Sequence, residues 1–192
     1  MNQITQLTVA KICHEMANHL SIIKFLQEDL AEHNSPELKE LLRTVDLLSL
    51  TMDFFRNIYS AKIDSVSLFE TLKKIYNLKG ISLSDPYTIV QSLPENLQNA
   101  ISGILYTIMK VSKPGDIVKV SGNFSMIVVD VPKDRALPKN VSASLEETSV
   151  NDDIFNIFVN YTKYLADLED YKILQERFGE EQRIKFIRAT KS

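Results

Sequence analysis

The sequence predicts an α+β protein in which an antiparallel helical hairpin precedes an α/β sandwich. Up to Ser60 the apolar residues recur in steps of three and four, the spacing of helices in a coiled coil or bundle. Beyond Ser60, helical and β-type segments alternate and include antiparallel hairpins. The chain has 192 residues, of which 44% are hydrophobic and 24% charged, a globular composition with enough residues to bury a core.

Two long helices are expected to form the hairpin. The apolar stripe of the first is Val9, Ile12, Met16, His19, Ile23, Leu26 and Leu30. The second is predicted over residues 36–61, with the stripe Leu38, Leu41, Val45, Leu48, Met52, Phe55 and Tyr59. Ser35 is a typical N-cap, Pro36 suits the first helical position, and Glu37 lies near the positive helix end. The short connection at residues 32–35 forces the helices to run antiparallel.

The second helix carries more apolar surface than one partner helix covers. Its second apolar face is formed by Leu42, Leu47, Leu50, Phe54 and Ile58. We expect a second copy of the hairpin to cover this face, which gives a homodimeric four-helix bundle about a two-fold axis. The alternative is that the C-terminal half of the same chain covers it.

The rest of the chain is predicted as alternating helices and strands. Helices are expected over Ser65–Leu78, residues 94–112 and residues 152–167. Strands are expected over residues 87–91, 116–121 and 124–131, and in a terminal hairpin over residues 171–188. Residues 132–150 are polar, which fits either a sheet edge or a loop.

Composition excludes several functional classes. A net charge of -3 and a pI near 5.7 argue against a protein that binds the nucleic-acid backbone. Only 5 glycines argue against a glycine-rich nucleotide loop, and 1 cysteine excludes an internal disulfide framework and suits a reducing compartment. The N-terminus lacks the pattern of a signal peptide, and no apolar run approaches the roughly 18 residues of a membrane span. We therefore expect a cytoplasmic protein that does not enter the membrane.

Of the 3 histidines, His14 is the candidate for chemistry. At about 100° per residue, His14 lies opposite the apolar stripe and faces water, beside Lys11, Asn18 and Ser21. An isolated histidine there is usually an ordinary surface residue. However, Glu15 follows it, and a carboxylate beside an imidazole holds one ring nitrogen as N–H and leaves the other free as a nucleophile.

The other histidines are expected to be structural. His19 falls on the apolar stripe, where a core histidine is the simpler interpretation and a second functional imidazole the alternative, and His33 lies in the interhelical loop. A zinc site of the zincin type is excluded because it needs histidines at i and i+4 on one helical face, whereas the i+4 residue here is Asn18 and His19 is turned by about 140°. No metal ligand set is predicted.

The segment Lys11-Ile12-Cys13-His14-Glu15-Met16 resembles the phosphoacceptor box of ChpT-type dimeric histidine phosphotransferases. More loosely, residues 14–18 resemble the H-box of sensor histidine kinases. The resemblance continues in order along the chain. It implies a dimerisation and histidine phosphotransfer hairpin at residues 1–62 and, at residues 63–192, a degenerate domain of the histidine-kinase ATPase (Bergerat-like) type.

The resemblance also implies that the second domain has lost its nucleotide site. Residues 110–118 resemble the end of the kinase helix that carries two phosphate-site asparagines, and those positions here are Gly103 and Thr107. Active kinases also need glycine-rich turns, and this chain has no G-x-G. No cofactor is therefore expected on this chain.

By resemblance, the protein relays a phosphoryl group between aspartates of receiver domains in a two-component phosphorelay. His14 is then the phosphoacceptor and Glu15 orients its ring. Contacts to the phosphoryl group or to the partner are expected from Leu7, Lys11, Asn18, Ser21, Ile22 and Phe25. The family implies Mg²⁺ in the receiver and, as partners, a hybrid histidine kinase and response regulators of the bacterial cell cycle.

One departure from the family pattern concerns the residues after the histidine. Family members usually carry Ser-Pro four and five residues after it, where this chain has Asn18 and His19.

Two other functions are alternatives to the relay. One is a non-catalytic dimeric adaptor that binds a response regulator, and the other is an autophosphorylating kinase that binds ATP.

Overall fold

The computed structural model describes residues 16, 20–23, 35–59, 65–84, 87–146 and 154–189. The chain forms two compact units, Met1–Leu78 and Lys79–Ser192. The predicted boundary lies between residues 62 and 63. The difference is helix α3 (Ser65–Leu78), which belongs to the first unit because it packs against helix α2 (Pro36–Ile58). The functional division into a phosphotransfer domain and a kinase-like domain stays a prediction.

Helix α2 begins as its sequence predicts. The Ser35 side chain accepts a hydrogen bond from the Leu38 N–H at 3.2 Å, and Pro36 and Glu37 occupy the first turn. The helix ends at Ile58, three residues before the predicted end. Its second apolar face, for which a second copy of the hairpin was expected, is covered within the chain at Phe54 and Ile58, both fully buried, and α3 packs against α2. The guanidinium of Arg43 donates to the C-terminal carbonyl of α3 at Leu78, with Nε at 3.0 Å, which joins the two helices.

The second unit is built on a five-stranded sheet in the order β1-β2-β3-β5-β4. The short β1 (Ser82–Leu83) pairs in parallel with β2 (Ile117–Asn123), and all other neighbours are antiparallel. These are β3 (Met126–Val131), β4 (Tyr171–Phe178) and β5 (Glu181–Arg188), which confirm the predicted strands and the terminal hairpin. Burial alternates along β3 and β5, so the sheet has one covered face.

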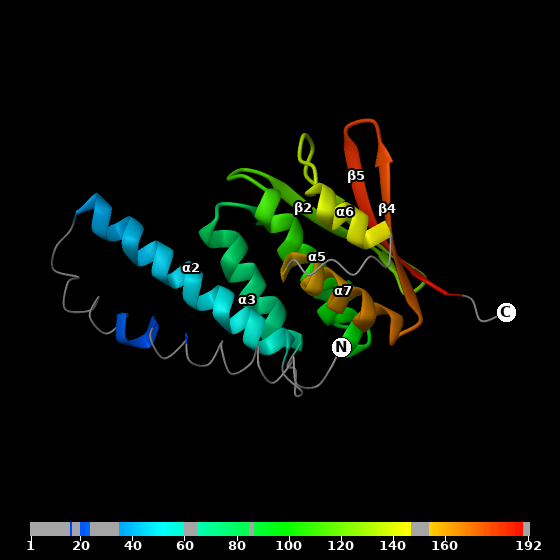
Figure 1. Cartoon of the computed structure of the whole chain (residues 1–192), viewed down its shortest axis with the longest axis horizontal. Helices are drawn as coiled ribbons and strands as arrows, with labels where there is room; N and C mark the ends of the chain where they lie inside the picture. Colours follow the sequence, from blue (N-terminus) through cyan, green and yellow to red (C-terminus); the bar gives the residue numbers. More distant parts are fainter. Residues whose placement is uncertain are drawn as a thin grey trace. The chain divides into compact units, whose positions relative to one another are not determined.

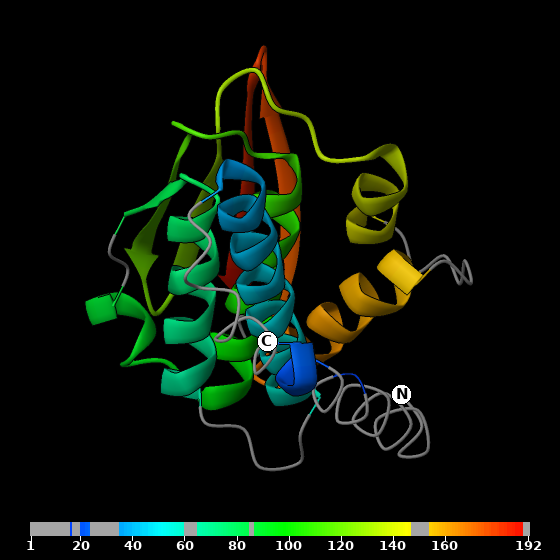
Figure 2. The ribbon, with the colours of Figure 1, turned by 90° about the vertical axis from the view of Figure 1, so that its left-hand side faces the viewer.

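Three helices lie on the covered face of the sheet: α5 (Glu95–Val111), α6 (Lys139–Glu146) and α7 (Ile154–Asp167), as Figures 1 and 2 show. Helix α5 is the centre of the core, because twelve of its residues are buried. The result is a two-layer α/β sandwich, and the predicted α+β class is confirmed. No helix among the described residues is long and apolar enough to cross a membrane.

Two of the predicted elements of the second unit need correction. Residues 87–91 were expected to form a strand, but Tyr87–Val90 is the single-turn helix α4, and the sheet edge is instead formed by β1. The β-branched residues at 88–90 suggested a strand by local propensity, which tertiary context overrides in so short a segment. The polar stretch at 132–150 contains α6, whose Val141 and Leu145 lie one turn apart and are buried.

A partly buried ion pair fixes the loop that leads from β3 toward α6. Arg135 donates from Nε to Asp116 Oδ2 at 2.8 Å and from Nη2 to Oδ1 at 3.1 Å, and the Lys113 N–H donates to Oδ2 at 2.8 Å. The two side chains are only 21% and 15% exposed. Burial raises the pKa of Asp116, but the hydrogen bonds and positive charges of Arg135 and Lys113 outweigh it, so the pKa lies below its usual value.

The pair predicts a pH-dependent contribution to stability. A lowered pKa in the folded state stabilises the protein above the unfolded-state pKa of about 4, and this stabilisation is lost as the pH falls through the folded-state pKa. Arg135→Ala is therefore expected to lower the free energy of unfolding by about 1–2 kcal/mol at pH 7 and by much less near pH 2. Urea denaturation at both pH values measures the difference.

Arg183→Ala is the matched control. Arg183 pairs with Asp130 at 3.0 Å, but the two side chains are 43% and 36% exposed. Its removal is expected to cost under about 1 kcal/mol. An equal loss for both variants at pH 7, or a loss for Arg135→Ala that does not change with pH, contradicts the assignment.

Candidate functional site

The predicted phosphoacceptor His14 lies outside the described residues. The same holds for Leu7, Lys11, Glu15, Asn18 and Phe25, so their roles stay predictions. Of the predicted contact residues, the structure describes Ser21 and Ile22, and it places both on an exposed helical segment. Ile22 is 60% exposed, as a residue that docks a partner requires.

The helical segment that contains Ser21 and Ile22 is anchored by Leu20. Leu20 forms a buried cluster with Val45 and Met52 of α2, and Phe55 packs against this cluster. In the helix that the sequence predicts for this part of the chain, the 100° spacing puts Ser21 within about 20° of position 14 and Leu20 about 120° from it. The anchored side and the side expected to carry His14 are therefore different sides of the helix.

An uncovered apolar seam runs beside the anchored side. Met16 and Ile23 are each 42% exposed, and on α2 Leu41 is 51% and Leu48 41% exposed. Each pair is seven residues apart, so each forms one row along its helix. Large apolar side chains in rows of this kind are typical of a surface that another helix covers. In the helix predicted from the sequence, Met16 and Ile23 lie about 160–180° from position 14.

In the second unit, Gly103 and Thr107 lie on α5 where it packs against α7. A Cβ on Gly103 would lie 2.5 Å from Thr162 Oγ1 and 3.2 Å from Thr162 Cγ2. The hydroxyl of Thr107 donates back to the Gly103 carbonyl at 2.9 Å, and the Thr162 hydroxyl to the Phe158 carbonyl at 3.0 Å. The space that a larger side chain at position 103 would need is therefore filled by Thr162 of α7.

Contacts along α5 and α7 define an antiparallel register. Tyr106 and Phe158 pack edge to face with their ring centroids 5.8 Å apart, and Asn96 Nδ2 donates to Glu169 Oε1 at 2.7 Å. Asn99 lies one turn before Gly103 and is fully buried, and neither atom of its amide has a hydrogen-bond partner among the described residues. Asn99 is not among the residues predicted from the sequence, although it is an asparagine one turn from Gly103 on a helix rich in apolar residues.

The described residues include no group of three or more histidine, cysteine, aspartate and glutamate side chains that can hold a metal ion. The predicted absence of a metal on the whole chain stays a prediction, because the three histidines lie outside the described residues.

Among solved structures, the chain is similar to a bacterial phosphotransferase. The sequence identity is 16%, the TM-score is 0.65, and the alignment covers 97% of both chains. This similarity shows a shared fold and confirms the fold expected from the resemblance. No protein-family profile and no curated relative matches the sequence.

Two histidine-kinase structures align at lower TM-scores. The histidine kinase domain of a blue-light activated histidine kinase from Erythrobacter litoralis aligns with 14% identity, a TM-score of 0.41, and 95% of this chain and 92% of that chain covered. Full-length ShkA in complex with AMPPNP aligns with 15% identity, a TM-score of 0.46, and 96% and 46% covered.

The contact between Gly103 and Thr162 predicts a coupled effect on stability. Alanine in place of glycine normally favours a helix by about 0.5–1 kcal/mol. Because the new Cβ meets Thr162, Gly103→Ala is instead expected to lower the free energy of unfolding by about 1–3 kcal/mol. Thr162→Ala removes both atoms that the Cβ meets most closely, so in that background Gly103→Ala is expected to be neutral or stabilising.

A double-mutant cycle with urea denaturation of the three variants and the wild type measures this coupling. Additive effects of the two substitutions would show that α7 does not fill this position.

Proposed function

We propose that this chain is a histidine phosphotransferase of two-component signalling. It relays a phosphoryl group between aspartates of receiver domains, with His14 as the carrier, in the cytoplasm. The observation that carries the proposal is the histidine box at residues 11–16 in a chain that shares its fold, over 97% of its length, with a bacterial phosphotransferase. The box resembles a phosphoacceptor motif, and the fold supplies the context that such a motif needs.

In the first half of the reaction, a ring nitrogen of His14 attacks the phosphorus of an aspartyl phosphate on a receiver. The N–P bond forms as the P–O bond breaks, and the receiver aspartate leaves as a carboxylate. The second half is the reverse reaction, in which a carboxylate of another receiver takes the phosphoryl group and His14 returns to its starting state. The phosphoryl group moves twice, and no oxidation or reduction is involved.

The neighbours of His14 are assigned by what this reaction requires. Glu15 accepts the ring N–H that does not react and so keeps the attacking nitrogen unprotonated. Lys11, Asn18 and Ser21 contact phosphoryl oxygens or carboxylates of the receiver. Leu7, Ile22 and Phe25 form the apolar docking surface, in agreement with the exposure of Ile22. Mg²⁺ held by the receiver neutralises charge on the transferred group.

The second unit supports a relay in preference to an autophosphorylating kinase. Thr162 occupies the space beside Gly103 into which an asparagine side chain would have to reach, and α5 and α7 are in close contact there. A chain without a nucleotide site has to obtain its phosphoryl group from another phosphoprotein, which a receiver provides.

A homodimer accounts for the uncovered seam of the first unit. The second copy would cover Met16, Ile23, Leu41 and Leu48. This face differs from the face of α2 for which the sequence predicted a second copy, because Phe54 and Ile58 of that face are already buried within this chain. Covering the exposed face leaves the side that carries His14 open to a receiver, because the two sides are about 160–180° apart around the first helix.

Disruption of the seam is expected to separate the dimer. The double variant Leu41→Glu/Leu48→Glu puts two charges where we expect apolar contact, so it is expected to be monomeric at about 10 µM, where the wild type is dimeric. Size-exclusion chromatography with light scattering measures the masses. Lys39→Glu is the control, since Lys39 is exposed and lies on the opposite side of α2 by helical geometry. A monomeric wild type at this concentration would contradict the proposed homodimer.

The function is tested with a receiver that carries radiolabelled phosphate. The wild-type chain is expected to take up label that is lost in acid and kept in base, and His14→Ala is expected to take up none. Glu15→Ala is expected to slow transfer about 100-fold, because the ring loses the group that fixes its protonation. His33→Ala, which removes the loop histidine, is the matched control and is expected to transfer normally.

Label on the His14→Ala variant would refute the assignment of the carrier. Tight receiver binding that is indifferent to His14, with no label on the wild type, would identify the protein as an adaptor. Binding of Mg-ATP in calorimetry would instead support a kinase.

A further inference from the structure

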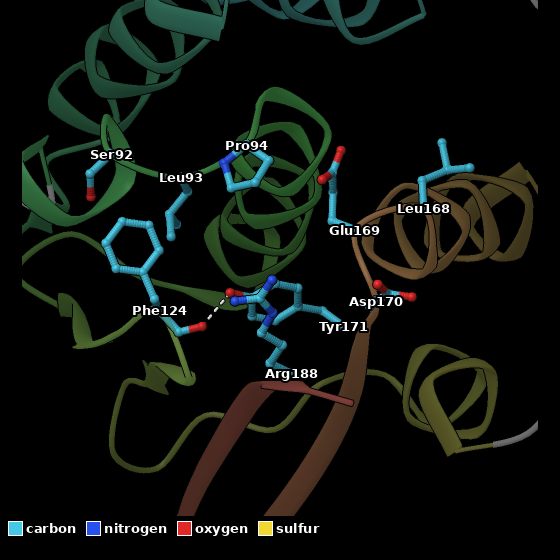
Figure 3. A pocket seen from close by; sticks show the side chains of 9 residues that line it. All are labelled: Ser92, Leu93, Pro94, Phe124, Leu168, Glu169, Asp170, Tyr171 and Arg188. Atoms are coloured by element: carbon cyan, nitrogen blue, oxygen red, sulfur yellow. Dashed lines mark hydrogen bonds between the residues drawn. The ribbon is translucent and has the colours of Figure 1, made fainter. Parts of the chain in front are cut away.

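A cavity of about 520 Å³ lies at the end of the second unit where α5 begins. Figure 3 shows the side chains of its nine lining residues, which come from four segments: Ser92 to Pro94, Phe124 in the β2–β3 turn, Leu168 to Tyr171, and Arg188 at the end of β5. Gly103 lies about two turns further along α5. The cavity is therefore separate from the region that resembles a kinase nucleotide site. Its volume falls within the roughly 300–1,000 Å³ that is usual for small-molecule sites.

The walls of this cavity are held in place by hydrogen bonds between the segments. The Tyr171 hydroxyl donates to the Phe124 carbonyl, drawn as a dashed line in Figure 3. The backbone N–H of Arg188 donates to the Ser125 carbonyl at 3.1 Å, and the backbone N–H of Ala189 donates to the Asp170 carbonyl at 2.7 Å. These bonds fix the two chain segments that carry the charged residues, so the cavity does not depend on a ligand for its shape.

Two opposite charges face the cavity without pairing with each other. The pKa of Tyr171 is raised, chiefly by burial; the charge of Arg188 lowers it and the charge of Glu169 raises it by smaller amounts. Both charges therefore lie near the Tyr171 hydroxyl. Even so, the described residues include no ion pair between Arg188 and Glu169, and the Arg188 guanidinium has no hydrogen bond to a described residue. Asn96 holds one carboxylate oxygen of Glu169 at 2.7 Å and so fixes this side chain.

Apolar groups form the remaining wall. Leu93 is almost fully buried, whereas Phe124 is 50% and Leu168 52% exposed. Figure 3 shows Phe124 and Leu93 on one side of the cavity and Glu169 on the other, with Arg188 beside Tyr171. The exposed phenylalanine offers a flat apolar surface next to the two separated charges.

We propose that this cavity binds a free α-amino acid with a large apolar side chain. Arg188 receives the carboxylate, Glu169 receives the ammonium group, and the side chain lies against Phe124 and Leu93. A simple anion fits less well, because the carboxylates of Glu169 and Asp170 outnumber the one guanidinium. A simple cation leaves Arg188 unpaired. A zwitterion satisfies both charges that the fold keeps apart.

The proposal is tested with L-phenylalanine and two blocked derivatives. Calorimetry on the full chain is expected to give saturable binding with a Kd of about 1 mM, the affinity that a ligand of about a dozen heavy atoms reaches. N-acetyl-L-phenylalanine lacks the ammonium group and L-phenylalaninamide lacks the carboxylate. Each is expected to bind at least about tenfold more weakly.

Matched variants locate the site. Arg188→Gln and Glu169→Gln are each expected to weaken L-phenylalanine binding at least about tenfold. Arg177→Gln and Glu180→Gln remove the same charges from the tip of the β4–β5 hairpin, outside the cavity, and are expected to bind normally. Thermal denaturation followed by circular dichroism confirms that each variant is folded.

Three results would overturn the proposal. The first is the absence of saturable binding by the wild type. The second is equal binding of the blocked derivatives, which would indicate apolar contact without charge recognition. The third is unchanged binding by folded Arg188→Gln and Glu169→Gln variants, which would place the ligand elsewhere.

Discussion

The close packing of α5 against α7 is the contact on which the rest of the second unit depends. At Gly103 the two helices approach so closely that an added Cβ would lie 2.5 Å from Thr162 Oγ1. On one side of Gly103 along α5, the ring of Tyr106 packs on that of Phe158, and on the other side Asn96 donates a hydrogen bond to the Glu169 carboxylate. The same contact between the helices thus fills the space beside Gly103 and also positions Glu169 in the wall of the cavity beside Tyr171. The fully buried amide of Asn99 lies one turn before Gly103 on the same helix.

In the first unit, the side of the first helix that makes packing contacts differs from the side expected to carry the phosphoacceptor. Leu20 anchors the helix on Val45 and Met52, and the row of Met16 and Ile23 is exposed. We propose that a second hairpin covers this row and that His14 lies on a different side of the helix. This separation follows from helical geometry alone, because seven-residue spacing keeps each kind of side chain on its own side. A carrier histidine needs this arrangement, since a receiver has to reach it while the dimer stays assembled.

The sequence was most informative where one periodic pattern specifies an element. The apolar spacing predicted α2, α3, α5 and α7, and the Ser35-Pro36 start of α2 is confirmed by its hydrogen bond. Short elements were not predictable, because the β-branched residues at 88–90 favour a strand locally while packing makes them the helix α4. The closure at Gly103 and the cavity at Arg188 depend on residues from distant segments. Their register cannot be read from any one stretch of sequence.

The central claim is that the phosphoryl group is carried on the side chain of His14. Tandem mass spectrometry at basic pH, after incubation of the wild-type chain with a phosphorylated receiver, tests it most directly because it locates the phosphorylated residue. The account predicts a phosphoramidate on His14 in the peptide that contains residues 11–16, with His19 and His33 unmodified. Phosphate on His19, on His33 or on a carboxylate of this chain would contradict it.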